Sequence, residues 1–212
     1  MLSSAPHSCP SIASREGRRH TPPLPTRVHG VTLIELMVTL VVLAIVLAIG
    51  APALNTFVER QAVEGAAEQF AGDIRYARTE AMKRGQAVSI CIRSETVVNG
   101  VTTVACAGAA GTRGYADGWL VFSDVDADGS FETADGDTTL RDQQAVSGQI
   151  SSMIRSGSTL AYTLQSTGVM LGGSGNITIT PKSGTSGKQV GCVIINFAGR
   201  ARVETGKEKC SA

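Results

Sequence analysis

The run from Val31 to Ala53 constrains this chain most, because it is mainly apolar and contains a single charge, Glu35. An α-helix over this run would be about 35 Å long, which is enough to cross the hydrocarbon core of a membrane. A charge inside such a helix is costly unless it finds a partner, so Glu35 is predicted to be functional. The alternative is a carboxylate that reaches the membrane surface, since Glu35 lies near the start of the run.

The residues before the run predict its orientation. Four arginines precede it and would hold the N-terminal side in the cytoplasm. They are Arg15, Arg18, Arg19 and Arg27. A secretory signal peptide is the competing interpretation, with small residues at 48–51 as the cleavage site. That interpretation leaves Glu35 unexplained, so we expect a single-pass membrane helix.

Gly30 and the five residues after it, Val-Thr-Leu-Ile-Glu, resemble the cleavage and assembly signal of type IV pilins and type II secretion pseudopilins. The resemblance implies that a prepilin peptidase cuts between Gly30 and Val31 and methylates the amine of Val31. Glu35 would then pair with an N-terminal amine, its own or that of a neighbouring subunit, during filament assembly. The family most often has phenylalanine where this chain has Val31, and many pilins carry a proline at the place of Pro52.

Four parts are expected along the chain. Residues 1–30 are a proline-rich leader that cannot bury a core and is removed. Residues 31–54 form the transmembrane half of a long helix, and residues 55–84 form its amphipathic half. Residues 85–212 form a C-terminal β-rich domain, large enough for a core of its own.

The amphipathic half is predicted from apolar residues that recur at helical spacing. These are Phe57, Phe70, Ile74, Ala77 and Ala81. Gly85 follows the last basic residues and should end the helix. Gly50 and Pro52 should kink the helix or melt it locally, because proline removes one backbone hydrogen bond.

After Gly85 the period of the sequence changes from helix to strand. Short β-prone runs are separated by Gly, Asp, Asn and Ser. They cover residues 87–92, 101–104, 118–122, 158–162, 176–180 and 190–197. The expected fold class is α+β, with a mostly antiparallel sheet packed on Phe70 and Ile74 of the long helix.

Three further patches resemble the GspH/FimT branch of minor pilins and pseudopilins. They are residues 77–85 at the expected helix end, residues 118–122 leading into 124–129, and residues 197–203. The resemblance spans nearly the whole chain after Gly30. It implies a type IV pilin-like fold.

The cysteines predict disulfides. Cys9 lies in the leader, and the even set that remains falls in a domain expected outside the cytoplasm. This set is Cys91, Cys106, Cys192 and Cys210. Three pairings are possible, and we favour Cys91 with Cys106 and Cys192 with Cys210, because each closes a loop flanked by strand-like sequence. A zinc site is disfavoured, since no pair shows close ligand spacing and every histidine lies in the leader.

The formal net charge is +1, but the charges are unevenly spread and the C-terminal end is basic. Alternation along a strand would place Arg200 and Arg202 on one face, where two guanidinium groups suit phosphate. The Gly-Arg-Ala-Arg segment resembles the DNA-contacting motif of FimT-like pilins. The resemblance implies that Arg200 and Arg202, helped by Lys207 and Lys209, bind double-stranded DNA without reading its sequence. Alternatively, the arginines only keep an exposed strand edge soluble.

Residues 124–135 follow the spacing of a calcium-binding loop, with aspartates at alternate positions and a glycine at the turn. The last position is Asp135 instead of a longer glutamate, and strand-like sequence flanks the loop. We therefore favour a polar hairpin tip and assign no metal and no cofactor.

No enzyme signature is found. After the leader there is no histidine, no nucleophile elbow and no phosphate loop. The expected function is that of a minor type IV pilin, held in the bacterial inner membrane with its C-terminal domain in the periplasm. It would join other pilins in a pilus and bind DNA during uptake. Alternatives are a structural minor pseudopilin of a type II secretion system and a pilin that only primes assembly or adheres.

Overall fold

The computed structural model describes residues 30–98, 100–184, 190–206 and 210. The chain divides into two compact units, with the boundary between Ile45 and Val46. Apart from the part of the long helix before Val46, all helices and strands named below belong to the second unit.

Helix α1 (Leu33–Arg84) begins two residues later than predicted. The Thr32 hydroxyl accepts a 3.3 Å hydrogen bond from the backbone N–H of Glu35 and so caps the first turn. The apolar part of the helix is long enough to cross a membrane, and its most apolar stretch is not buried within the protein. The helix is continuous across Gly50 and Pro52, so the local melting considered there does not occur.

The helix ends where predicted. Gly85 has φ +70°, in the left-handed region, and its N–H donates to the carbonyl of Ala81 at 3.0 Å. This conformation costs glycine little, and it turns the chain directly into the first strand.

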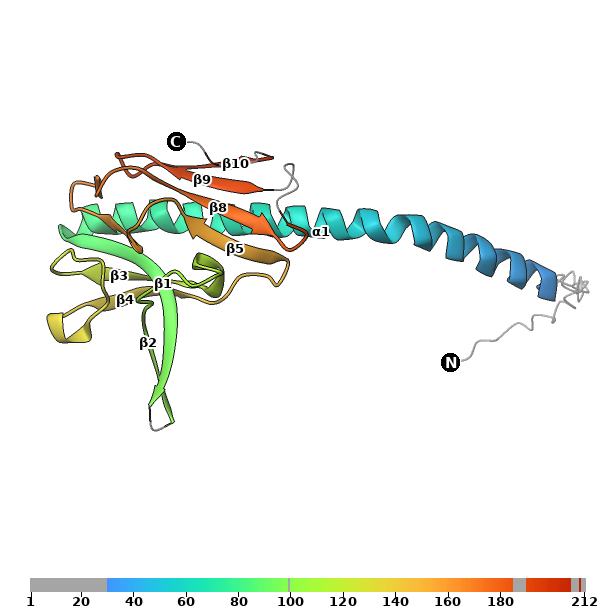
Figure 1. The fold of residues 1–212 in the computed structure, drawn as a ribbon, viewed down its shortest axis with the longest axis horizontal. Helices are drawn as coiled ribbons and strands as arrows, with labels where there is room; N and C mark the ends of the chain where they lie inside the picture. The colour runs from blue at the N-terminus through green and yellow to red at the C-terminus, as the bar shows by residue number, and fades with distance from the viewer. Residues whose placement is uncertain (1–29, 99, 185–189, 207–209, 211–212) are drawn as a thin grey trace, which may run out of the picture. The chain divides into compact units, whose positions relative to one another are not determined.

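Two antiparallel sheets follow, which confirms the α+β class (Figure 1). The first has the order β4-β3-β1-β6-β7, with β2 paired to β1, and the second has the order β10-β9-β8-β5. The first sheet contains β1 (Ala87–Val98), β2 (Val101–Cys106), β3 (Trp119–Asp124), β4 (Thr138–Gln143), β6 (Ala161–Leu164) and β7 (Met170–Leu171). The second contains β5 (Ile150–Arg155), β8 (Gly175–Pro181), β9 (Gly191–Ile195) and β10 (Ala201–Thr205). Two short 3-10 helices, η1 (Tyr115–Asp117) and η2 (Thr133–Asp135), lie in the connections.

The core forms where α1 meets both sheets. Phe70 is fully buried and packs edge to face against the rings of Tyr115, Trp119 and Tyr162. Small residues let the backbones approach closely: a Cβ added at Gly191 of β9 would lie 2.6 Å from Val63 Cγ1 on α1. The part of α1 after Ile45 is therefore an integral part of the second unit.

Strands β4 and β5 and the two-residue strand β7 were not predicted. In β4 the side chains of Thr138, Thr139, Arg141 and Asp142 are exposed, so no apolar alternation marks it. In β5 only Ile150 and Met153 are buried, because a register shift after Ile150 breaks the two-residue period. Strand β6 lies three residues later than the predicted run at 158–162.

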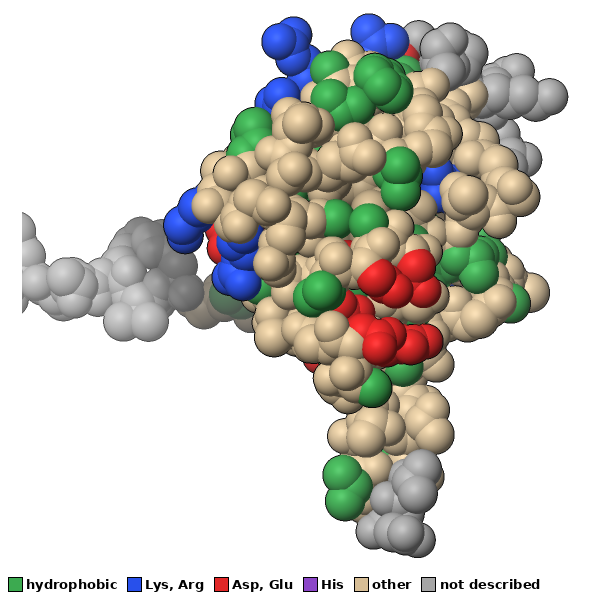
Figure 2. Space-filling model, turned by 90° about the vertical axis from the view of Figure 1, so that its left-hand side faces the viewer, with side chains coloured by type: hydrophobic (Ala, Val, Ile, Leu, Met, Phe, Trp, Pro, Cys, Tyr) green, Lys and Arg blue, Asp and Glu red, His purple; other side chains and the backbone are tan. Residues whose placement is uncertain are grey.

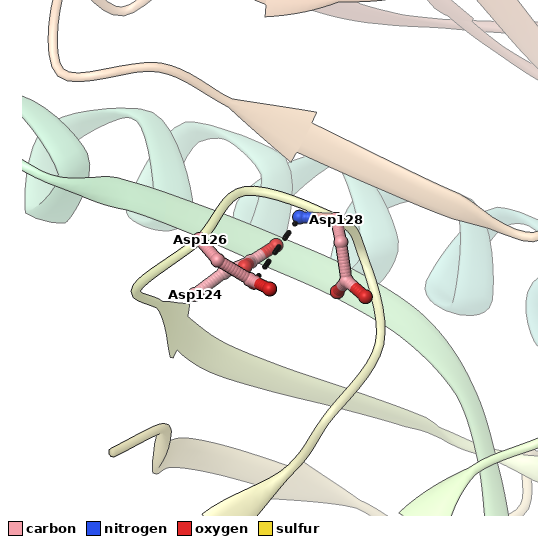
Figure 3. A group of neighbouring side chains, drawn as sticks. All are labelled: Asp124, Asp126 and Asp128. Atoms are coloured by element: carbon pink, nitrogen blue, oxygen red, sulfur yellow. Dashed lines mark hydrogen bonds between the residues drawn. The ribbon is translucent and has the colours of Figure 1, made fainter. Parts of the chain in front are cut away.

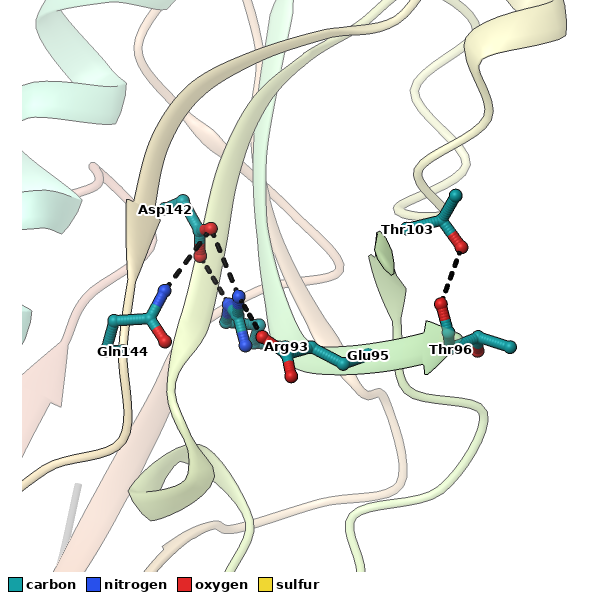
Figure 4. A network of polar contacts seen from close by, with 6 residues as sticks. All are labelled: Arg93, Glu95, Thr96, Thr103, Asp142 and Gln144. Atoms are coloured by element: carbon teal, nitrogen blue, oxygen red, sulfur yellow. Dashed lines mark hydrogen bonds and ion pairs between the residues drawn. The ribbon is translucent and has the colours of Figure 1, made fainter. Parts of the chain in front are cut away.

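A polar network holds β4 in place (Figure 4). The Arg93 guanidinium on β1 reaches across β3 to Asp142 on β4, with Nη2 3.2 Å from Oδ2, and also pairs with Glu95 at 2.6 Å. Gln144 donates to the same Asp142 carboxylate at 3.4 Å. The side chain of Arg93 is only 9% exposed, so this pairing is partly shielded from solvent.

Both favoured disulfides are present in the structure. Cys91 of β1 is bonded to Cys106 of β2, and Cys192 of β9 is bonded to Cys210 near the chain end. Each cross-link joins segments fewer than 20 residues apart in sequence, as the sequence predicts.

Candidate nucleic-acid interface

The hairpin between β9 and β10 carries the two arginines singled out from the sequence. Its turn is closed by hydrogen bonds from Asn196 N to Arg200 O at 3.1 Å and from Gly199 N to Asn196 O at 2.9 Å. The Asn196 side chain also accepts the Arg200 N–H at 2.9 Å. Arg200 therefore lies in the turn, and strand pairing starts at Ala201. Of the two arginines predicted to lie on one strand, Arg202 is in β10 and Arg200 lies one residue before it.

The two arginines nevertheless lie on one surface. Both side chains are exposed, and both line a hollow of about 580 Å³ together with Ile194, Asn196 and Ser174. Lys207 and Lys209, predicted as their helpers, lie outside the described residues.

Gly199 is required by the geometry of this turn. Its φ is +68°, and an added Cβ would lie 2.6 Å from the carbonyl oxygen of Gly168, in the turn after β6. It would also lie 3.1 Å from Cδ of Arg78 on α1. The hairpin tip is thus packed against the helix and against the first sheet, and Arg200 follows directly from that fixed point.

Two arginines of α1 reach the same hairpin. Arg75 Nη2 donates to the carbonyl of Ala201 at 3.3 Å, and Arg78 Nε donates to the carbonyl of Gly168 at 3.0 Å. With Arg200 they line a second hollow of about 320 Å³. Arg75 and Arg78 were not predicted as functional residues, although their i, i+3 spacing places them on one helix face.

The acidic partners in this region are weak ones. Arg202 pairs with Glu204 at 3.2 Å and Arg75 pairs with Glu68 at 3.8 Å, with both arginine side chains more than half exposed. Within the described residues Arg200 forms no ion pair. Because exposed pairs contribute only about 0–1 kcal/mol, an anionic ligand could replace them at little cost.

Charge is segregated on this side of the molecule (Figure 2). Lys and Arg side chains gather at the top and along one side of the view, and Asp and Glu side chains gather separately near the centre. The separation leaves basic surface away from the central acidic group, where a polyanion could bind.

The residues predicted to guide processing and assembly lie at the other described end of the chain. Gly30 and Val31 are exposed and precede the helix, so a protease could reach the bond between them. Glu35 is exposed in the first turn of α1. Cleavage, methylation and the pairing of Glu35 stay predictions.

Comparison with known proteins identifies the family and the fold. A family model described as type II transport protein GspH matches residues 66–199, and the prokaryotic N-terminal methylation motif matches residues 25–51. The type IV minor pilin FimU of Pseudomonas aeruginosa has a similar structure, with a TM-score of 0.51 and 20% identity over 71% of this chain and 93% of FimU.

The minor pseudopilin EpsH of the Vibrio cholerae type 2 secretion system also matches, with a TM-score of 0.45 and 14% identity over 68% of this chain and 96% of EpsH. Among curated proteins, none matches the sequence. The GspH model covers more than half of the chain, and the two sheets packed on a long N-terminal helix agree with the FimU fold. The chain therefore belongs to the family of the type II transport protein GspH.

Proposed function

We propose that this chain is a minor type IV pilin that binds double-stranded DNA through its basic hairpin. In this proposal a prepilin peptidase cuts after Gly30, α1 anchors the protein in the inner membrane, and the β-rich domain lies in the periplasm. The cut chain then joins other pilins in a pilus. The methylation motif at residues 25–51 and the exposed Gly30–Val31 bond support the processing step.

The observation that carries the DNA proposal is the convergence of Arg75, Arg200 and Arg202 on one hairpin. Arg200 and Arg202 line one hollow, Arg75 and Arg200 line another, and all three side chains are exposed. Guanidinium groups bind phosphate in a bidentate manner, and a cluster of them can contact successive phosphates without reading bases. The expected binding is therefore independent of sequence and sensitive to salt.

The test measures the affinity of the full-length chain, purified in detergent, for a fluorescent DNA duplex over a range of salt concentrations. Each phosphate contact contributes about 0.9 to the slope of log K against log salt concentration. We expect the double variant Arg200→Ala and Arg202→Ala to bind more weakly and to reduce that slope by roughly 2.

A matched control removes two positive charges elsewhere, as Arg60→Ala with Lys182→Ala. Both control residues are exposed. Lys182 follows Pro181, at the end of β8 that is farthest from the turn between β9 and β10. Equal affinity and slope for the hairpin variant and the wild type would refute the assignment. A loss of equal size in the control would also refute it.

The second candidate is a structural minor pseudopilin of a type II secretion system. The description of the matching family as a type II transport protein favours it. Its fold and processing would be the same, but its contacts would be with other pseudopilins and secreted proteins. Salt-dependent DNA binding that requires Arg200 and Arg202 separates the two candidates.

A further inference from the structure

The loop that follows β3 brings three carboxylates together. Asp124 ends β3, and Asp126 and Asp128 follow at alternate positions of the loop. One carboxylate oxygen from each lies within 4.8 Å of the other two (Figure 3). Two oxygens bound to one calcium ion at 2.3–2.6 Å can be at most about 5 Å apart, so the three fit around a single ion.

Asp124 adds an observation that is independent of this clustering. Its side chain is fully buried, and its Oδ2 accepts hydrogen bonds from Ser89 Oγ at 2.5 Å and from Gly129 N at 2.9 Å. Its Oδ1 is also buried, yet it has no hydrogen-bond partner among the residues that the structure describes. A buried carboxylate oxygen without a donor is costly unless it is coordinated, and a cation would satisfy it.

The loop also lacks compensating charge. None of the ion pairs among the described residues involves an acidic residue of the segment 124–137. Farther along the loop, the neighbouring Asp135 carboxyl raises the pKa of Glu132, and Asp128 and Asp126 raise it further. Negative charge thus accumulates at one end of the first sheet, and no ion pair among the described residues balances it.

The loop is fixed in this shape by groups outside the three aspartates. Asp137 is buried, and its two oxygens accept the backbone N–H groups of Val125 and Glu132, each at 3.0 Å. Phe131 packs edge to face on Phe122 of β3, with ring centroids 5.4 Å apart. The hydrogen bonds of Asp137 and the packing of Phe131 therefore hold the loop in the shape that brings the carboxylates together.

We propose that a calcium ion binds between Asp124, Asp126 and Asp128, with the free Oδ1 of Asp124 as its buried ligand. Calcium fits because the candidate ligands are all oxygens and carry several negative charges on a preformed loop, whereas magnesium retains most of its water. Asp135 in place of glutamate and the flanking strands argued against calcium in the sequence. Neither affects these three residues, since β3 positions Asp124 and Asp137 holds the loop closed. The proposal does not depend on DNA binding.

The test uses the full-length chain in detergent, stripped of metal with a chelator. Titration of calcium chloride is followed by calorimetry, and the Tm is measured with calcium, with magnesium and with chelator. We expect one calcium site with a Kd of about 10⁻⁴–10⁻³ M, as in extracellular modules, and a Tm that rises with calcium concentration. Magnesium at the same concentration should produce a much smaller rise.

The double variant Asp126→Asn and Asp128→Asn keeps the size of both exposed side chains and removes two charges. It should weaken calcium binding more than tenfold and abolish the calcium-dependent rise in Tm. Asp117→Asn removes the charge of one exposed aspartate in η1; it is the control and should bind calcium as the wild type does.

Three outcomes would overturn the proposal. In the first, calcium gives neither binding heat nor a Tm shift with the wild-type chain. In the second, magnesium and calcium raise the Tm equally, and in the third, the double variant binds calcium as tightly as the wild type. Because the wild-type titration is decisive alone, a variant that fails to fold leaves the proposal testable.

Discussion

The indole Nε1 of Trp119 donates a 2.7 Å hydrogen bond to Oδ2 of Asp73, which joins the start of β3 to α1 inside the core. Asp73 is only 4% exposed, and its other oxygen accepts from Arg141 of β4 at 2.6 Å. The Arg141 guanidinium lies over the ring of Tyr76, 3.7 Å from its centroid. One carboxylate thus connects the helix to two adjacent strands of the first sheet.

We expect Asp73→Ala to lower the free energy of unfolding by about 2–3 kcal/mol, since it leaves the buried N–H of Trp119 without an acceptor. For a chain of this size that corresponds to a Tm lower by roughly 5–10 °C. Circular dichroism on heating would measure it. Glu68→Ala removes an exposed carboxylate that pairs with Arg75, and should change stability by at most about 0.5 kcal/mol. Equal Tm values for the two variants would contradict the role of Asp73.

Gly199→Ala should destabilise the chain by at least about 2 kcal/mol, because it combines a strained backbone with a contact to the Gly168 carbonyl. Gly172→Ala is the control. Gly172 has φ +84°, but an added Cβ there would meet nothing within 4 Å, so only the strain of about 1 kcal/mol remains. Thermal unfolding of both variants tests the difference. A Gly199→Ala variant no less stable than Gly172→Ala would show that the hairpin tip is not packed as described.

Glu35→Ala should leave cleavage after Gly30 intact and prevent incorporation into a filament, because the carboxylate is proposed to pair with an N-terminal amine. Mass spectrometry of the membrane-extracted protein should find Val31 as the first residue in both the wild type and the variant. Immunodetection in sheared filaments should find the wild type only. Glu64→Ala, an exposed carboxylate farther along α1, should assemble normally. Normal incorporation of Glu35→Ala would remove its assigned role.

The sequence predicted the elements whose pattern is local. The end of α1 at Gly85 and the strands with strong alternation were found because a single segment contains the whole signal. Both disulfides followed from loops flanked by strand-like sequence. Strands β4 and β5 were missed because β4 is mainly exposed and a bulge interrupts β5.

The sequence could not show which polar residues become buried. Asp73 occupies a polar position of an amphipathic helix, yet two sheets cover α1, so its side chain lies in the core next to Trp119. Arg75 and Arg78 join Arg200 only because the turn after β6 and the β9–β10 hairpin meet at the helix. Such contacts link residues about 90 to 130 positions apart, and no local pattern records them.

The packing of Gly199 against Gly168 and Arg78 has a mechanical consequence. Tension applied to the hairpin would pass into the side of α1 through this contact and the bond from Arg75 to Ala201. A load on the arginines would therefore be passed to the part of α1 that packs on the two sheets. The hairpin could be pulled without first unravelling a loop.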